Sequence, residues 1–166
     1  MGDFKAIKDY CHQNKFIFHV SPLIFSKTDG NEAPKELRIA KDDLSLILKE
    51  IDEITRHRHL HKYDVPCSAL FSSFAIDCNG DVFPCNSLLY KVGNINNDTI
   101  KNIWYESESL KFIQNIKNSD LKTCIECNYK VQCDRCPGMA LLDGKSVFSC
   151  DTFAKSCAEI RLSNYC

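Results

Sequence analysis

The chain has 166 residues, of which 44% are hydrophobic and 26% are charged, and its formal net charge is -1. This composition is typical of a globular protein with an apolar core. The nearly neutral charge, without a long basic stripe, excludes the electrostatic footprint of a nucleic-acid-binding protein. No apolar run reaches the ~18 residues of a membrane span, and the charged N-terminal residues lack the pattern of a secretory signal. We therefore expect a cytoplasmic protein that binds neither nucleic acid nor membranes.

Cysteine is the residue type that departs most from an ordinary composition. The chain has 11 cysteines, several times the usual number for its length, and an odd total fits poorly with a closed disulfide framework. In a reducing cytoplasm, clustered cysteines indicate metal ligands rather than disulfides.

The first third of the chain predicts two helices and one strand. Apolar residues at three-to-four spacing predict a helix over residues 3–13, and the apolar run at 15–20 predicts a buried strand that ends at Ser21-Pro22. A second helix is predicted from Asp42 to about His57, with one apolar stripe and acidic residues in its first turn. A helix followed by a short apolar strand is the repeating step of an α/β barrel or sheet. Because one such step cannot cover both faces of a parallel strand, we expect this part to be incomplete by itself.

Three alternating histidines, His57, His59 and His61, close the second predicted helix. Their odd spacing would spread them around a helix, whereas a basic helix end interacts favourably with the C-terminal dipole. They are therefore not assigned to a metal site.

A hairpin is predicted in the middle of the chain. Strand-like runs at 71–77 and 81–85 flank Asn79-Gly80, which is a strong hairpin signal. With a two-residue turn, Cys78 would face Asp81, and it would lie ~13 Å along the ladder from Cys85. Cys78 is therefore expected to be a packed or free thiol rather than a second ligand beside Cys85.

Three short helices are predicted after the hairpin. Asp98 can cap the first and Ser107 the second. Aliphatic and aromatic residues at helical spacing predict that both helices bury one face. A closing helix is predicted over Ala158–Leu162.

The densest motif is a thirteen-residue stretch, here named the cysteine hub (residues 124–136), which is followed by Pro137-Gly138. It contains two Cys-x-x-Cys pairs, five residues apart: Cys124, Cys127, Cys133 and Cys136. Each pair can turn both sulfurs towards one metal centre, so the hub can deliver four thiolates to one centre or divide them between two. The Cys-Pro ending is similar to ferredoxin-type runs, in which the fourth cysteine ligates a second cluster. The hub therefore predicts an iron–sulfur site.

A structural zinc site is the competing interpretation. Zinc takes four thiolates tetrahedrally, usually from two Cys-x-x-Cys pairs with a long segment between them. Five residues between the pairs is short for that geometry. A zinc site would also leave Cys67, Cys85 and Cys157 without a role.

The second part of the chain resembles the SPASM domain, the auxiliary iron–sulfur module of many radical SAM enzymes. The likeness covers roughly residues 63–162. It is carried by Cys67, the run Gly80–Cys85, the run Gly93–Ile95 before a Trp-bearing helix, the cysteine hub, and Cys157. The last two hub cysteines are separated by two residues, where the best-known pattern has three.

The resemblance implies two [4Fe-4S] clusters and a ligand set for each. One cluster would be held by Cys124, Cys127, Cys133 and Cys157. The other would be held by Cys67, Cys85 and Cys136. Some members have a further ligand six residues after the first cysteine, where this chain has Ser73. Cys150, Cys78 or an open iron therefore remain as the fourth ligand of that cluster.

The resemblance also implies the fold and the kind of enzyme. We expect an α+β chain in which residues 1–62 are the tail of a radical SAM α/β barrel with its bridging helix. Residues 63–166 would form a small SPASM domain, with a β-hairpin and short helices around two clusters. The expected partners are a peptide or protein substrate, or a missing N-terminal radical SAM half.

The motif that such enzymes use to bind S-adenosylmethionine, Cys-x-x-x-Cys-x-x-Cys, is absent from this sequence. S-adenosylmethionine is therefore expected only in a complete enzyme, and no residue here is assigned a catalytic role. Sulfatase-maturing members place a catalytic Asp where this chain has Asn86, which cannot serve as a carboxylate base. The remaining interpretations are a part of a peptide- or protein-modifying enzyme and a stand-alone, non-catalytic cluster-binding module.

Overall fold

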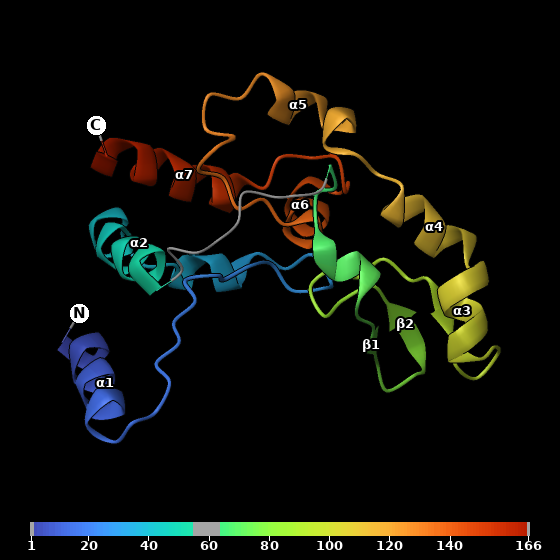
Figure 1. Cartoon of the computed structure of the whole chain (residues 1–166), viewed down its shortest axis with the longest axis horizontal. Helices are drawn as coiled ribbons and strands as arrows, with labels where there is room; N and C mark the ends of the chain where they lie inside the picture. The colour runs from blue at the N-terminus through green and yellow to red at the C-terminus, as the bar shows by residue number, and fades with distance from the viewer. Residues whose placement is uncertain (1, 55–63, 166) are drawn as a thin grey trace.

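The structure, a computed structural model, describes residues 2–54 and 64–165. It has the predicted α+β class, because helices combine with one small antiparallel sheet, which lies at one side of the molecule beside α3 (Ile100–Glu106) (Figure 1). The α-helices are α1 (Gly2–Gln13), α2 (Lys41–Ile54), α3 (Ile100–Glu106), α4 (Glu108–Gln114), α5 (Lys122–Ile125), α6 (Pro137–Gly144) and α7 (Thr152–Tyr165). The strands are β1 (Ala75–Ile76), β2 (Asp81–Phe83) and β3 (Gly93–Asn94). Within the described residues, no helix is long and apolar enough to cross a membrane.

The two helices predicted in the first third are confirmed as α1 and α2. The strand predicted at 15–20 is wrong, because that segment has no strand pairing and Ile17 is 96% exposed. Lys15, at φ 59°, turns the chain out of α1. A run of apolar residues forms a strand only where another strand can accept its backbone hydrogen bonds. The tract with His57, His59 and His61 lies outside the described residues.

Helices α2 and α7 pack against each other although they are far apart in sequence (Figure 1). Their contact is a small core made of Leu44, Leu48, Phe153, Cys157 and Ile160. Helix α7 is longer than the predicted Ala158–Leu162 segment because it begins directly after Asp151. It therefore connects the N-terminal part of the chain with the cysteine-rich part.

The predicted hairpin forms, but its turn has three residues rather than two. Ala75 pairs with Phe83 and Ile76 with Val82, which leaves residues 78–80 in the turn. Gly80 takes a φ of 81°, the left-handed conformation that three-residue hairpin loops require at this position. Cys78 is consequently an exposed turn residue, and the predicted pairing of Cys78 with Asp81 is wrong.

A second core joins the sheet to helices α3 and α4. It is made of Val82, Val92, Ile103 and Leu110. Gly93 in β3 allows a close approach, because a Cβ there would lie 2.8 Å from Ile103 Cγ1. The predicted cap Ser107 is confirmed, since its hydroxyl accepts from the Leu110 N–H. The cap of α3 is Thr99 rather than Asp98, one residue later than predicted.

The segment between α1 and α2 is attached to the cysteine-rich part by one carboxylate. The side chain of Asp143 in α6 is 5% exposed and pairs with Lys35 at 3.1 Å. The hydroxyls of Ser26 and Thr152 donate to its two oxygens. Asp143 thus joins three segments that are distant in sequence.

Candidate metal centre

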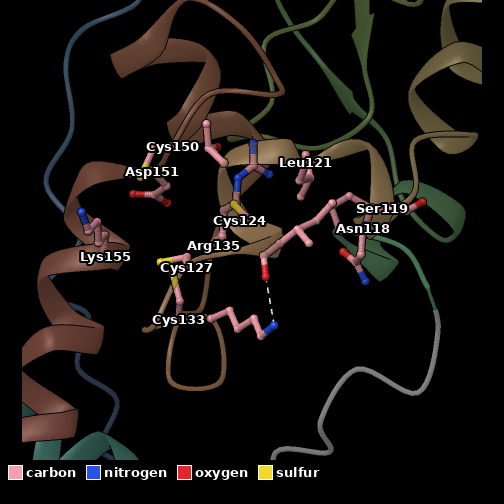
Figure 2. A pocket seen from close by; sticks show the side chains of 14 residues that line it. Asn118, Ser119, Leu121, Cys124, Cys127, Cys133, Arg135, Cys150, Asp151 and Lys155 are labelled. Carbon is pink, nitrogen blue, oxygen red and sulfur yellow. Dashed lines mark hydrogen bonds between the residues drawn. The ribbon is translucent and has the colours of Figure 1, made fainter.

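Three of the four hub cysteines and Cys150 line one cavity of about 490 Å³, here named the hub cavity. Figure 2 shows Cys124, Cys127, Cys133 and Cys150 around this space, together with Arg135, Asp151 and Lys155. The volume is sufficient for a group much larger than one metal ion. The predicted convergence of the hub thiols is therefore present for Cys124, Cys127 and Cys133.

Short turns position these hub cysteines. Cys124 lies in α5, and the N–H of Cys127 donates to its carbonyl at 3.2 Å. The N–H of Lys130 donates in turn to the Cys127 carbonyl at 3.2 Å. Consecutive turns of this kind keep the two sulfurs of a Cys-x-x-Cys pair on one side of the chain.

Cys150 is brought to the hub cavity by the start of α7. The next residue, Asp151, is 2% exposed and caps this helix, because its Oδ1 accepts from the Ala154 N–H at 2.9 Å. Its other oxygen, Oδ2, accepts from the Cys136 N–H at 3.1 Å. One buried carboxylate thereby fixes the start of α7 against the end of the hub. Sequence reasoning missed this role, although an Asp before a helical run is a common capping signal.

The environment of the hub cavity favours the protonated form of Cys133 and Cys150 in the absence of a metal. The pKa of Cys133 is raised to about 12, mainly by burial and to a smaller extent by the negative charge of Asp151 and by the neighbouring cysteines. Burial also raises the pKa of Cys150. Thiolates clustered in this cavity therefore need a positive partner, which a metal centre supplies.

Cys67, Cys85 and Cys136 form a second group, here named the second cysteine group. Cys67 and Cys85 pack against the same apolar core. Burial raises the pKa of Cys136, and the nearby Asp151 and Cys67 raise it by smaller amounts. Backbone hydrogen bonds from Met139 and Gly138 at the start of α6 act in the opposite direction and lower it.

Backbone N–H groups reach the sulfurs of this group. The Leu88 N–H donates to Cys85 Sγ at 3.3 Å. Gly138 permits the two halves of the group to meet, because a Cβ there would lie 2.1 Å from the Ser87 carbonyl oxygen. Helix α6, which the sequence did not predict, therefore carries Cys136 to the loop that follows Cys85.

The other candidate residues lie elsewhere. Cys157 is 6% exposed in the α2–α7 core and lines a different cavity, of about 290 Å³, with Asp134 and Arg161. Cys78 is exposed in the hairpin turn. Ser73 donates to the Pro84 carbonyl at 3.1 Å, which supports the strand end before Cys85.

The donor set fits an iron–sulfur group. The cysteines of the described part of the chain are free thiols, and thiolate is the usual ligand of such clusters. In residues 2–54 and 64–165, no three His, Cys, Asp or Glu side chains have the spacing for a single metal ion. Arg135 Nη1 is buried and has no hydrogen-bond partner among the described residues. A buried cationic N–H beside several thiols is suited to an anionic group.

Residues 67–128 match the model of the SPASM family, an iron–sulfur cluster-binding domain. This segment is a SPASM domain. The resemblance noted from the sequence is thereby confirmed for the part that contains Cys67, Cys85, Cys124 and Cys127. Binding of iron–sulfur clusters follows from membership of the SPASM family. Searches of curated proteins and of solved structures found no significant match.

Proposed function

We propose that this chain is the cluster-binding C-terminal part of a radical SAM enzyme that modifies a peptide or protein. The observation that carries the proposal is the convergence of cysteines from separate segments into two groups. The SPASM match covers residues 67–128, and both groups are completed by cysteines that follow it. The proposal places a [4Fe-4S] cluster in each group.

The proposed ligands of the first cluster are Cys124, Cys127, Cys133 and Cys150, because these four line the hub cavity. The sequence-based assignment had Cys157 in place of Cys150. We prefer Cys150 because Cys157 packs between α2 and α7 and lines another cavity.

The proposed ligands of the second cluster are Cys67, Cys85 and Cys136. Its fourth position has no assigned residue, since Cys150 is used by the first cluster. Cys78 is exposed in the hairpin turn. An open iron at this position would be the place for a substrate group.

When bound, such clusters supply one-electron transfer or an open coordination site. The chain's own residues hold them and limit contact with water. Leu70, Leu88 and Leu121 belong to the core against which Cys67, Cys85 and Cys124 pack, and each of these leucines is at most 4% exposed. The backbone N–H groups of Met139 and Gly138 favour the thiolate form of Cys136, which a cluster requires.

The surface of the N-terminal part supports a missing barrel as its partner. Helix α1 has no buried residue. Large apolar side chains on this part are exposed: Ile7, Tyr10, Phe16, Ile17, Leu23 and Leu37. Apolar side chains gathered in this number indicate a surface that another structure covers. The proposed cover is the radical SAM half to which residues 1–62 would belong.

The test of cluster binding is anaerobic reconstitution of the chain with iron and sulfide. Two [4Fe-4S] clusters require about eight irons and eight sulfides per chain. Stoichiometric zinc after anaerobic purification, with no uptake of iron, would instead support a structural zinc module.

The test of the enzyme assignment is formation of 5′-deoxyadenosine. The reconstituted chain, reduced with dithionite and given S-adenosylmethionine, should make none, because it lacks the Cys-x-x-x-Cys-x-x-Cys motif. Addition of a radical SAM domain that carries this motif, encoded upstream or on a separate chain, should restore the product. If no such domain restores it while the clusters are intact, the chain is a stand-alone cluster-binding module.

A further inference from the structure

Arg135 is one of two cationic side chains of the cysteine hub that line the hub cavity, and the other is Lys130. Arg135 lies between Cys133 and Cys136 and lines the same cavity as Cys124, Cys127 and Cys150 (Figure 2). Its side chain therefore lies beside the thiols that we assign to the first cluster.

Two of the three guanidinium nitrogens have partners. Nε donates to the Ser149 carbonyl at 3.2 Å, and Nη2 donates to the Ser149 carbonyl at 2.8 Å and to the Val147 carbonyl. Ser149 directly precedes Cys150, and Val147 lies three residues before it. The guanidinium plane is thus fixed between the hub and the segment that delivers Cys150.

The third nitrogen, Nη1, is buried and has no hydrogen-bond partner among the described residues. In the same part of the chain, no carboxylate forms an ion pair with Arg135; Asp151, which also lines the cavity, accepts from the Cys136 and Ala154 N–H groups. An unpaired, buried, cationic N–H is costly, because water that would solvate it is removed. Such a group needs an anionic acceptor.

We propose that Arg135 is the charge partner of the cluster in the hub cavity and sets its reduction potential. Nη1 donates a hydrogen bond to a sulfur of the cluster or of its cysteine ligands. Reduction adds one electron and one negative charge to the cluster. A fixed cation beside it therefore stabilises the reduced form more than the oxidised form and raises the potential. This inference rests on the proposed binding of a cluster by Cys124, Cys127, Cys133 and Cys150.

The other cations that line the cavity are less suited to this role. Lys130 is exposed and its Nζ donates to the Ile125 carbonyl at 2.9 Å. Lys155 lies 5.8 Å from the centre of the Tyr129 ring. Solvent screens an exposed lysine much more than a buried guanidinium. Lys130→Met is therefore a matched control, since it removes a charge from the same cavity.

The first experiment measures midpoint potentials of the reconstituted chain by dithionite titration with EPR detection. Dithionite is oxidised and each cluster accepts one electron. Arg135→Met should lower the equilibrium constant for reduction of one cluster at least about tenfold, which is ~59 mV for a one-electron couple. Arg135→Lys should lower the potential by less than Arg135→Met does, because lysine keeps the positive charge. Lys130→Met should change the constant less than about twofold, because the charge is screened.

Assignment of the affected cluster uses Cys85→Ser, which removes a ligand of the other cluster only. The signal that persists in this variant should be the one that Arg135→Met shifts. An unchanged potential in Arg135→Met with full iron content overturns the proposal. Equal shifts in Arg135→Met and Lys130→Met overturn it as well, because they would show a general charge effect.

A second experiment compares the native chain with Arg135→Lys and remains decisive if Arg135→Met fails to fold. The native chain is produced with arginine labelled with ¹⁵N only in the guanidinium, and the reduced cluster is measured by pulsed EPR. A ¹⁵N hyperfine coupling that disappears in Arg135→Lys supports the hydrogen bond. No ¹⁵N coupling to either reduced cluster overturns it. Absence of iron from the native chain would instead refute the proposed cluster binding, so the two failures are distinguishable.

Discussion

Arg161 in α7 forms a forked ion pair with Asp52 in α2. Nε lies 3.0 Å from Asp52 Oδ2, and Nη2 lies 2.9 Å from Oδ1. Nη1 reaches the hub, where it donates to Asp134 at 2.9 Å and to the Gln132 carbonyl at 3.1 Å. One guanidinium therefore ties both long helices to the residues on either side of Cys133.

Replacement of Arg161 by Met is expected to destabilise this junction. Burial alone would lower the Arg161 pKa, but its carboxylate partners outweigh burial and raise it, so the side chain stays cationic. Arg161→Met leaves Asp52 and the Gln132 carbonyl without this donor and should cost about 1–3 kcal/mol. A urea titration of the anaerobic, reconstituted chain measures this as a lower midpoint. The control Lys111→Met removes an exposed cation from α4 and should leave the midpoint unchanged.

Substitution of Cys150 and of Cys157 should have different consequences. Cys150→Ser removes a thiolate from the hub cavity and should lower the iron content by up to one cluster, about four irons. Cys157→Ser should keep the iron content, because Cys157 lies in the α2–α7 core, and should reduce thermal stability slightly. Iron and sulfide analysis and a melting curve of each variant measure this. If Cys157→Ser loses iron and Cys150→Ser does not, Cys157 is the fourth ligand of the hub cluster, as the sequence-based assignment had it.

Gly138→Ala should separate the two halves of the second cysteine group. The added Cβ would lie 2.1 Å from the Ser87 carbonyl oxygen, and a backbone shift of this kind costs about 1–3 kcal/mol. We expect weaker binding of the cluster held by Cys85 and Cys136, measured as faster iron loss to a chelator. Gly2→Ala is the control, because a Cβ at Gly2 meets nothing within 4 Å. Equal rates of iron loss in both variants would contradict this role of Gly138.

Cluster assembly should accelerate as the pH rises. Burial raises the pKa of Cys133 to about 12, so this thiol is almost entirely protonated at neutral pH, and only the thiolate binds iron. Below that pKa the thiolate fraction grows about tenfold per pH unit. Thiolate-bound clusters absorb broadly near about 400 nm. The initial rate at which this absorbance increases should therefore rise between about pH 6.5 and 8.5. A rate independent of pH would show that deprotonation of the hub thiols does not limit assembly.

Local patterns in the sequence were sufficient for several features. The apolar stripe and acidic first turn of α2, and the cap at Ser107, predicted elements that the structure contains. The short spacings of the hub predicted the convergence of Cys124, Cys127 and Cys133, because residues so close in the chain can reach one point through turns alone.

The strand predicted at 15–20 failed because an apolar run does not show whether a neighbouring strand exists. The hairpin register failed because Asn-Gly occurs in turns of more than one length, and the Asp77 carboxylate accepts from the Asn79 and Asp81 N–H groups in the longer one. The absence of the strand and the length of the turn both depend on which groups accept or donate the backbone hydrogen bonds, and local composition does not specify these groups.

The sequence by itself determined that this is a cysteine-rich α+β chain with a SPASM domain, because the ligand spacings and turn residues are local. Only the tertiary structure decided which distant cysteine joins the hub cavity. The resemblance assigned Cys157 to the cluster of the hub and left Cys150 as a possible ligand of the other cluster, but Asp151 caps α7 and holds Cys150 beside the hub. The same helix turns Cys157 towards α2. That choice depends on helix packing between residues more than a hundred positions apart, which no local pattern records.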